Sequence, residues 1–209
     1  RIGKEAFCDA VGSVILPESV ETVGAGAFAR ISYVEAHEGT AKGLMEALFP
    51  LEGNRSYPED SVAFYVHQKD VAAPLYVPIP LTVAKNERVL LSKAWDEKRL
   101  SPGILAKCYT YIENEKEKRS FGLLLLSQFP SAKETAPIRA ELGRISHFLA
   151  REFLEMEDED QLLELLQLRI IRQEKVLGLV NLAKAKGLKQ SVEALRQYSA
   201  REAARKQGR

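Results

Sequence analysis

The chain has 209 residues, of which 45% are hydrophobic and 28% charged, and its net charge is +1. This composition excludes a wholly disordered or collagen-like chain, and the small net charge provides no global attraction to nucleic acid or to a membrane surface. No apolar run approaches the ~20 residues of a membrane span. The two cysteines, Cys8 and Cys108, are too few for a disulfide framework, so we expect two buried thiols.

Charge is distributed unevenly along the chain. Residues 1–80 carry 6 basic and 11 acidic side chains, net −5, whereas residues 81–209 carry 24 and 18, net +6. The asymmetry indicates two regions of different character, joined near Pro74–Pro80.

A short repeat occupies the first thirty residues. Ile2–Phe7 recurs as Val23–Phe28, with an apolar residue, Gly, Ala and Phe all displaced by 21 positions. Between the two copies, Val14 and Leu16 alternate as in a short strand with one buried face, and Pro17 ends that strand. A coil of this size cannot bury its own apolar face, so it must stack on neighbouring coils.

This repeat resembles the short bacterial leucine-rich repeat of BspA-like surface antigens. The resemblance covers residues 1 to about 30 and implies a right-handed solenoid with one strand per coil, and protein or surface binding rather than catalysis. We expect Gly24 to permit a turn, Ala27–Phe28 to fill the gap between coils, and the solenoid to end near residue 36. The residues that carry the likeness are Val14, Leu16, Pro17, Ser19, Val20, Val23, Gly24, Ala27 and Phe28.

A mixed α/β connector is expected over residues 37–85. Thr40–Phe49 has the pattern of a short helix capped by Thr40. Val62–Val66 and Leu75–Val77 have the pattern of strands, and the nearby prolines indicate an edge strand or an extended connector.

Helix patterns dominate from residue 86, which predicts an α-helical domain over 86–200 and a basic, disordered tail over 201–209. Ser101 followed by Pro102 predicts a capped helix start. Thr135 is expected to cap a further helix, and Gly187 to form a left-handed C-terminal cap. A 3.6-residue period is carried by Ile138, Leu142, Ile145, Leu149, Phe153 and Met156.

This half also resembles the uncharacterised helical domain that follows leucine-rich repeats in many Firmicute proteins, over residues 95–200. The chain departs from that pattern at Arg169 and Arg172, where acidic or amide residues are usual. The resemblance implies a fold and an accompanying repeat, and it implies no reaction. The residues that carry it are Phe129, Pro130, Leu163, Leu166, Val176, Leu179, Val180, Leu182, Ala183, Lys186, Gly187, Val192, Leu195 and Tyr198.

No pattern for catalysis, cofactor binding or metal binding emerges from the sequence. His37 and His67 stand isolated, as surface or cap residues do, and His147 lies between two arginines one turn away on either side. The acidic run Glu155–Asp160 lacks the alternation and central glycine of a calcium loop, so it is interpreted as a helix connector. We therefore predict no catalytic residue, no cofactor and no metal.

The predicted fold class is α+β, with short leucine-rich-repeat coils followed by a mostly α-helical domain. The predicted function is non-catalytic protein–protein interaction, through exposed positions of the repeat such as Ile15, Glu18 and Glu21. A nucleic-acid-associated adaptor acting through the basic C-terminal helix is one alternative, although the sequence lacks a base-reading signature. An unrecognised enzyme is the other.

The chain opens at Arg1, within a repeat, which predicts a fragment of a longer array. Cutting a solenoid in mid-repeat would expose Ile2, Phe7 and Val14, and we expect self-association through that end. The two resemblances differ on the compartment: relatives of the helical part favour the cytoplasm, and the surface antigens favour the cell surface.

Overall fold

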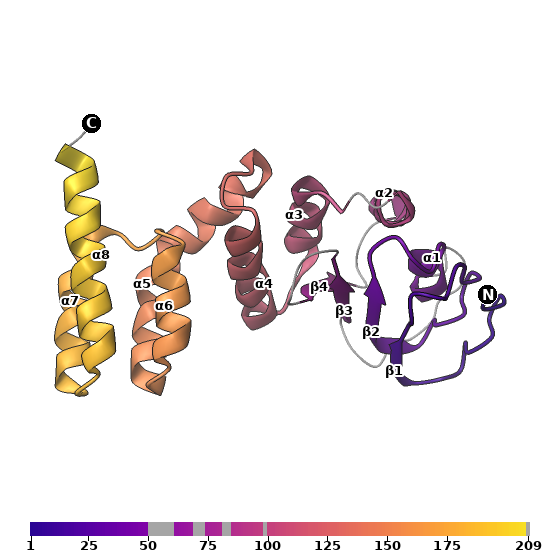
Figure 1. Cartoon of the computed structure of the whole chain (residues 1–209), viewed down its shortest axis with the longest axis horizontal. Helices are drawn as coiled ribbons and strands as arrows, with labels where there is room; N and C mark the ends of the chain where they lie inside the picture. Colours follow the sequence, from indigo (N-terminus) through magenta and orange to yellow (C-terminus); the bar gives the residue numbers. More distant parts are fainter. Residues whose placement is uncertain (50–60, 69–73, 81–84, 98–99, 208–209) are drawn as a thin grey trace. The chain divides into compact units, whose positions relative to one another are not determined.

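The computed structural model describes residues 1–49, 61–68, 74–80, 85–97 and 100–207. The fold is mixed α/β, with a four-stranded sheet and eight α-helices in these ranges (Figure 1). The chain divides into two compact units, Arg1–Phe121 and Gly122–Arg209. The first unit contains the whole sheet, and the second is helical.

The sheet follows chain order, β1-β2-β3-β4. Strands β1, β2 and β3 are parallel, and β4 runs antiparallel to β3. The expected strands at 62–66 and 75–77 are confirmed as β3 and β4, and β4 lies at an edge as its prolines indicate. The bounds of the strands are Gly12–Ile15, Ile31–His37, Ser61–His67 and Leu75–Pro80.

Residues 1–49 form successive backbone segments, or passes, that lie side by side and are joined by backbone hydrogen bonds. The N–H of Ile2 donates to the carbonyl of Thr22 (2.9 Å), and the N–H of Phe28 donates to the carbonyl of Ala47 (3.0 Å). Parallel bridges also join Ile2 to Val23 and Thr22 to Lys42. The stacking therefore continues past residue 36, where the sequence analysis expected it to end.

Two glycines lie where successive passes approach most closely. A Cβ added to Gly24 would lie 2.4 Å from the backbone nitrogen of Lys4, and one added to Gly43 would lie 2.5 Å from the carbonyl oxygen of Val23. Gly43 also has a φ of +83°, whereas Gly24 is not among the positive-φ glycines. Gly24 is thus required for close approach of two backbone segments, rather than for a turn.

Apolar side chains fill the space between these passes, as expected for Ala27 and Phe28. Both are buried, and the ring of Phe28 stacks on Phe7 at 6.0 Å between centroids. The repeat also orients β1 as expected, since Leu16 is buried while Ile15 is 67% exposed.

One face of the sheet forms the core of the first unit. Val34, Phe64 and Val77 are in register and are buried. The ring of Phe64 lies edge-on to the buried ring of Trp95, 4.9 Å between centroids, and Trp95 Nε1 donates to the carbonyl of Thr40. The second helix therefore belongs with the sheet, although the sequence analysis grouped it with the helical part.

The helices of the first unit are held by local caps of different kinds. The side chain of Ser101 accepts a hydrogen bond from the N–H of Ile104, which confirms the predicted cap. Thr40 does not cap the first helix: its hydroxyl donates to the carbonyl of His37, and Gly43 is the N-cap. The helices are α1 (Leu44–Leu48), α2 (Lys85–Asp96), α3 (Pro102–Tyr111) and α4 (Glu115–Gln128), which continues past the boundary between the units.

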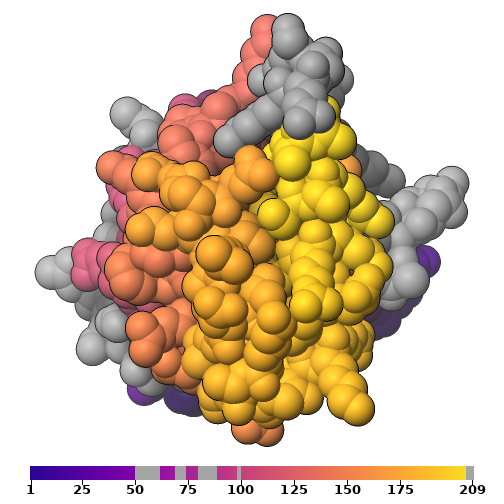
Figure 2. Space-filling view, turned by 90° about the vertical axis from the view of Figure 1, so that its left-hand side faces the viewer, coloured from indigo at the N-terminus to yellow at the C-terminus, as the bar shows by residue number. Residues whose placement is uncertain are grey.

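The second unit is built from four packed helices. Helix α5 packs on α6 and α7, and α8 packs on α6 and α7. Figure 2 shows α7 and α8 side by side on one surface. The helices are α5 (Ala136–Met156), α6 (Glu159–Gln167), α7 (Gln173–Ala185) and α8 (Lys189–Gln207).

Caps in the second unit agree only in part with the sequence analysis. Thr135 makes no capping hydrogen bond, because its hydroxyl donates to the carbonyls of Phe129 and Ala132 instead. Gly187 is left-handed with a φ of +72°, and the N–H groups of Gly187 and Leu188 close a Schellman motif on α7, as predicted. Met156, expected on the buried stripe of α5, is 67% exposed.

The C-terminal segment is helical where a disordered tail was expected. Helix α8 continues to Gln207. The physical reason is its content of alanine, arginine and lysine, which are strong helix formers, and α8 itself contains no glycine.

Candidate functional site

The sheet has a second face, opposite to the core, that carries polar side chains on strands β2, β3 and β4. In-register residues of neighbouring strands point to the same side of a sheet. Glu35 is in register with Tyr65, and Tyr65 with Tyr76. The term "polar face" is used below for six partly exposed residues, namely Tyr33, Glu35, His37, Tyr65, His67 and Tyr76.

Three tyrosines form a row across the polar face. The ring centroids of Tyr33 and Tyr65 are 5.0 Å apart, and those of Tyr65 and Tyr76 are 5.1 Å apart. The hydroxyl of Tyr76 donates to Glu117 Oε1 on α4 at 2.9 Å. Three aromatic rings from three strands thus form one continuous, partly exposed surface.

Glu35 lies between two donors of the polar face. Its Oε2 accepts from the hydroxyl of Tyr33 at 3.0 Å, and its Oε1 lies 2.6 Å from Nε2 of His67. These hydrogen bonds, first from His67 and then from Tyr33, lower the pKa of the Glu35 carboxyl. The same bond to Glu35, together with burial, raises the pKa of the Tyr33 hydroxyl. Glu35 is therefore held in its ionised form.

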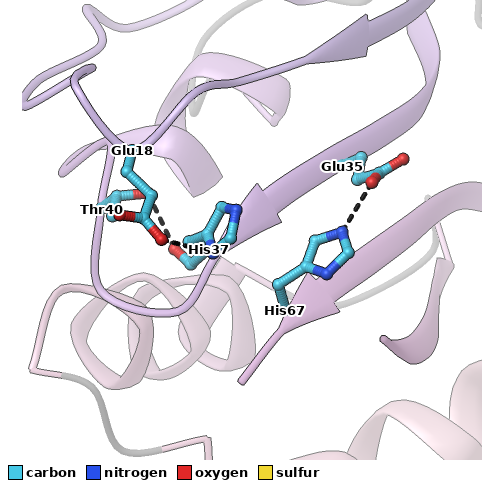
Figure 3. A network of polar contacts seen from close by, with 5 residues as sticks. All are labelled: Glu18, Glu35, His37, Thr40 and His67. Atoms are coloured by element: carbon cyan, nitrogen blue, oxygen red, sulfur yellow. Dashed lines mark hydrogen bonds and ion pairs between the residues drawn. The ribbon is translucent and has the colours of Figure 1, made fainter. Parts of the chain in front are cut away.

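The two histidines at the carboxyl ends of β2 and β3 stack on each other, as Figure 3 shows. Their ring centroids are 4.8 Å apart with an interplanar angle of 24°. His37 Nδ1 also lies 3.0 Å from Glu18 Oε1. Each imidazole therefore has its own carboxylate partner, Glu18 for His37 and Glu35 for His67. The interpretation of these histidines as isolated residues was wrong.

The three predicted partner-binding residues do not form one group. Ile15 is in register with Glu35, so it extends the polar face onto β1. Glu18 reaches the face through its contact with His37. Glu21 is exposed on the following pass, where its carbonyl accepts from the N–H of Lys42.

Sequence reasoning missed the six residues of the polar face, although a signal was present. Tyr33, Glu35 and His37 alternate along β2, and Tyr65 and His67 alternate along β3, as solvent-facing residues of strands do. The parallel register that aligns the two runs was not apparent from the sequence.

In the part of the chain that the structure describes, no cluster of three or more His, Cys, Asp or Glu side chains is arranged to hold a metal ion. Burial raises the pKa of the Cys108 thiol to about 12, so this thiol stays protonated at neutral pH. Cys8 is only partly buried, contrary to expectation.

Membrane-spanning segments were also sought. Across the described ranges, no helix combines the length and the apolar character needed to cross a bilayer.

Comparison with known proteins gives no match to this chain. Searches of protein-family models, of curated proteins and of solved structures found none that matches. The polar face is therefore interpreted from its own geometry and chemistry.

Proposed function

We propose that the chain is a non-catalytic protein–protein interaction module and that the polar face is its binding surface. The observation that carries the proposal is the tyrosine row of Tyr33, Tyr65 and Tyr76. Tyrosine is enriched at protein interfaces because its ring supplies a large contact area at a small cost in conformational entropy. The row lies on rigid strands, which favours binding without reorganisation.

We further propose that residues 1–49 are coils of a leucine-rich repeat of the BspA-like type. Support comes from the parallel bridges between passes, from the glycines at their close approaches, and from the Phe7–Phe28 stack. In this proposal the polar face is the strand surface of the array. The packed helices of the second unit support the proposed likeness to the Firmicute helical domain only at the level of helical content and pairing.

The test is capture of a partner by the 209-residue chain, with variants that separate the polar face from the remaining surface. Tyr65→Ala removes the central ring of the row, and Ile15→Lys adds a positive charge at an exposed position in register with Glu35. Leu177→Ser, at a 72% exposed position of α7, is the control. We expect a captured protein to bind the wild type and the control alike, and each face variant at least about tenfold more weakly.

Two results would overturn the protein-binding proposal. One is a partner whose affinity changes with the Leu177 variant but not with either face variant, provided that all variants unfold at similar temperatures. The other is the recovery of no protein that depends on the polar face.

The nucleic-acid alternative is favoured by one observation. Helix α8 extends to Gln207 and presents Arg196, Arg201 and Arg205 as exposed side chains. Binding of an oligonucleotide that weakens steeply with salt, and that is lost on replacing these arginines by glutamine, would support this alternative. The uncharged face variant Tyr65→Ala should leave such binding unchanged.

A further inference from the structure

Three hydrogen-bond donors of the polar face point at carboxylates within the protein. The Tyr33 hydroxyl donates to Glu35, and the Tyr76 hydroxyl donates to Glu117. Because an ionised carboxylate only accepts, the Nε2 of His67 that lies 2.6 Å from Glu35 must carry a proton. Each of these three donors is therefore committed to an acidic side chain.

Apart from the Tyr65 hydroxyl, which can donate or accept, the groups left for a partner are acceptors. An ionised carboxylate has about four acceptor sites, and the contacts of Glu35 with Tyr33 and His67 occupy one on each oxygen. The phenol oxygen of Tyr33 can also accept. In neutral His67 the second ring nitrogen, Nδ1, is a further acceptor. A partner that binds this surface without leaving buried acceptors unpaired must supply donors.

The polar face is acidic as well as rich in hydrogen-bond acceptors. The four strands contain no lysine and no arginine. Acidic side chains lie beside them: Glu18 contacts His37, Glu117 on α4 accepts from Tyr76, and Glu38, just after β2, accepts from Gln68 at 3.4 Å. The complementary partner group is therefore a cation.

We infer that the polar face binds an arginine side chain from a segment of the partner, an assignment that rests on the protein-binding function proposed above. A guanidinium group supplies five donors in one plane and stacks on aromatic rings. It can pair with the Glu35 carboxylate while its plane lies against the tyrosine row. A lysine ammonium supplies the charge but lacks the planar shape, so arginine is the better fit.

The test is selection of short random peptides by the 209-residue chain, followed by chemical replacement within the selected peptides. We expect selection to enrich arginine. Replacing that arginine by citrulline keeps the shape and removes the charge, and it should weaken binding by about tenfold or more. Replacement by lysine should have an intermediate effect.

Variants of the chain assign the effect to the polar face. Glu35→Gln keeps the size of the side chain and removes its charge, so it should reduce the difference between arginine and citrulline peptides. Leu177→Ser should leave that difference unchanged.

The possible failures are distinguishable. If selected peptides depend on Tyr65 but lack arginine, or tolerate citrulline, the arginine assignment is overturned and the protein-binding function stands. If no selected peptide depends on Tyr65 or Ile15, both the assignment and the proposed function fail.

Discussion

His37 and His67 stack with their ring centroids 4.8 Å apart. They are in register on the neighbouring parallel strands β2 and β3. Glu18 contacts the His37 ring and Glu35 contacts the His67 ring. The stack therefore links a carboxylate that follows β1 to a carboxylate on β2 through two imidazole rings.

Glu35 should make the stability of the first unit sensitive to acid. Its pKa is lowered in the folded state, so the folded protein binds fewer protons than the unfolded chain in the window below the ordinary value of 4.5. The free energy of unfolding therefore rises with pH through that window, and the contribution of Glu35 is lost as the pH falls through its folded pKa. Denaturant unfolding, followed by the fluorescence of the only tryptophan, Trp95, measures this. Glu35→Gln should show a shallower dependence, and an unchanged slope would refute the assignment.

Alanine substitutions at three glycines should have opposite effects on stability. Gly24→Ala and Gly43→Ala place a Cβ within 2.5 Å of backbone atoms of the preceding pass, so each should destabilise the chain by more than about 1 kcal/mol. Gly178 lies within α7 and has open space around an added Cβ, so Gly178→Ala should stabilise by about 0.5–1 kcal/mol. Denaturant midpoints of the three variants provide the comparison, and tolerance of alanine at Gly24 would contradict the stacked passes.

Two hydroxyls hold the segment between α6 and α7. Ser146 Oγ donates to the carbonyl of Ile170 at 3.1 Å, and the Tyr198 hydroxyl donates to the carbonyl of Ile171 at 2.6 Å. Ser146→Ala and Tyr198→Phe each leave a buried carbonyl without that donor, and should lower the free energy of unfolding by about 1–3 kcal/mol. Thr110→Val removes an exposed hydroxyl bond to Lys107 and should stay within about 0.5 kcal/mol of wild type.

Burial separates the two cysteines chemically. The pKa of the Cys108 thiol is raised to about 12 by burial, whereas Cys8 is partly exposed. A thiol reagent at mildly alkaline pH should therefore modify Cys8 in the folded protein and reach Cys108 only after unfolding. Mass spectrometry of the labelled peptides gives the site. Rapid labelling of Cys108 under native conditions would contradict the packing around α3.

Self-association through the N-terminal repeat remains a proposal with a direct test. Phe7 is 51% exposed, and Ile2 and Val14 are partly buried. Sedimentation velocity at increasing concentration should show a rising average mass that Phe7→Glu reduces. Phe148→Glu, at an exposed position of α5, is the matched control. A mass that does not change with concentration would rule the association out.

Features fixed by neighbouring residues were predictable from the sequence, and features fixed by distant ones were not. Ser101 and Gly187 sit in local motifs whose partners lie a few residues away, and both were predicted correctly. Thr135 has an equally good cap sequence, yet its hydroxyl bonds to carbonyls that precede it. The local sequence does not reveal that choice.

The candidate site required long-range information. Ile15 could be predicted as exposed, because the alternation around Leu16 fixes which side faces solvent. The tyrosine row depends on the register between Tyr65 and its two neighbouring strands, which no periodicity within one strand determines. Trp95 likewise joins the sheet core through tertiary packing that the helical pattern around it did not indicate.

The reversal of direction at β4 makes the two edges of the sheet unequal. Along β4, Pro78 and Pro80 lack backbone N–H groups, and prolines in an edge strand sit with the nitrogen side turned away from the ladder. An additional strand that paired with that edge would lack the backbone N–H donors of these two positions. Strand β1, Gly12–Ile15, contains no proline and pairs in parallel with β2. Lateral growth of the sheet is therefore directional, with β1 as the edge that can receive another strand and β4 as the terminus that resists edge-to-edge aggregation.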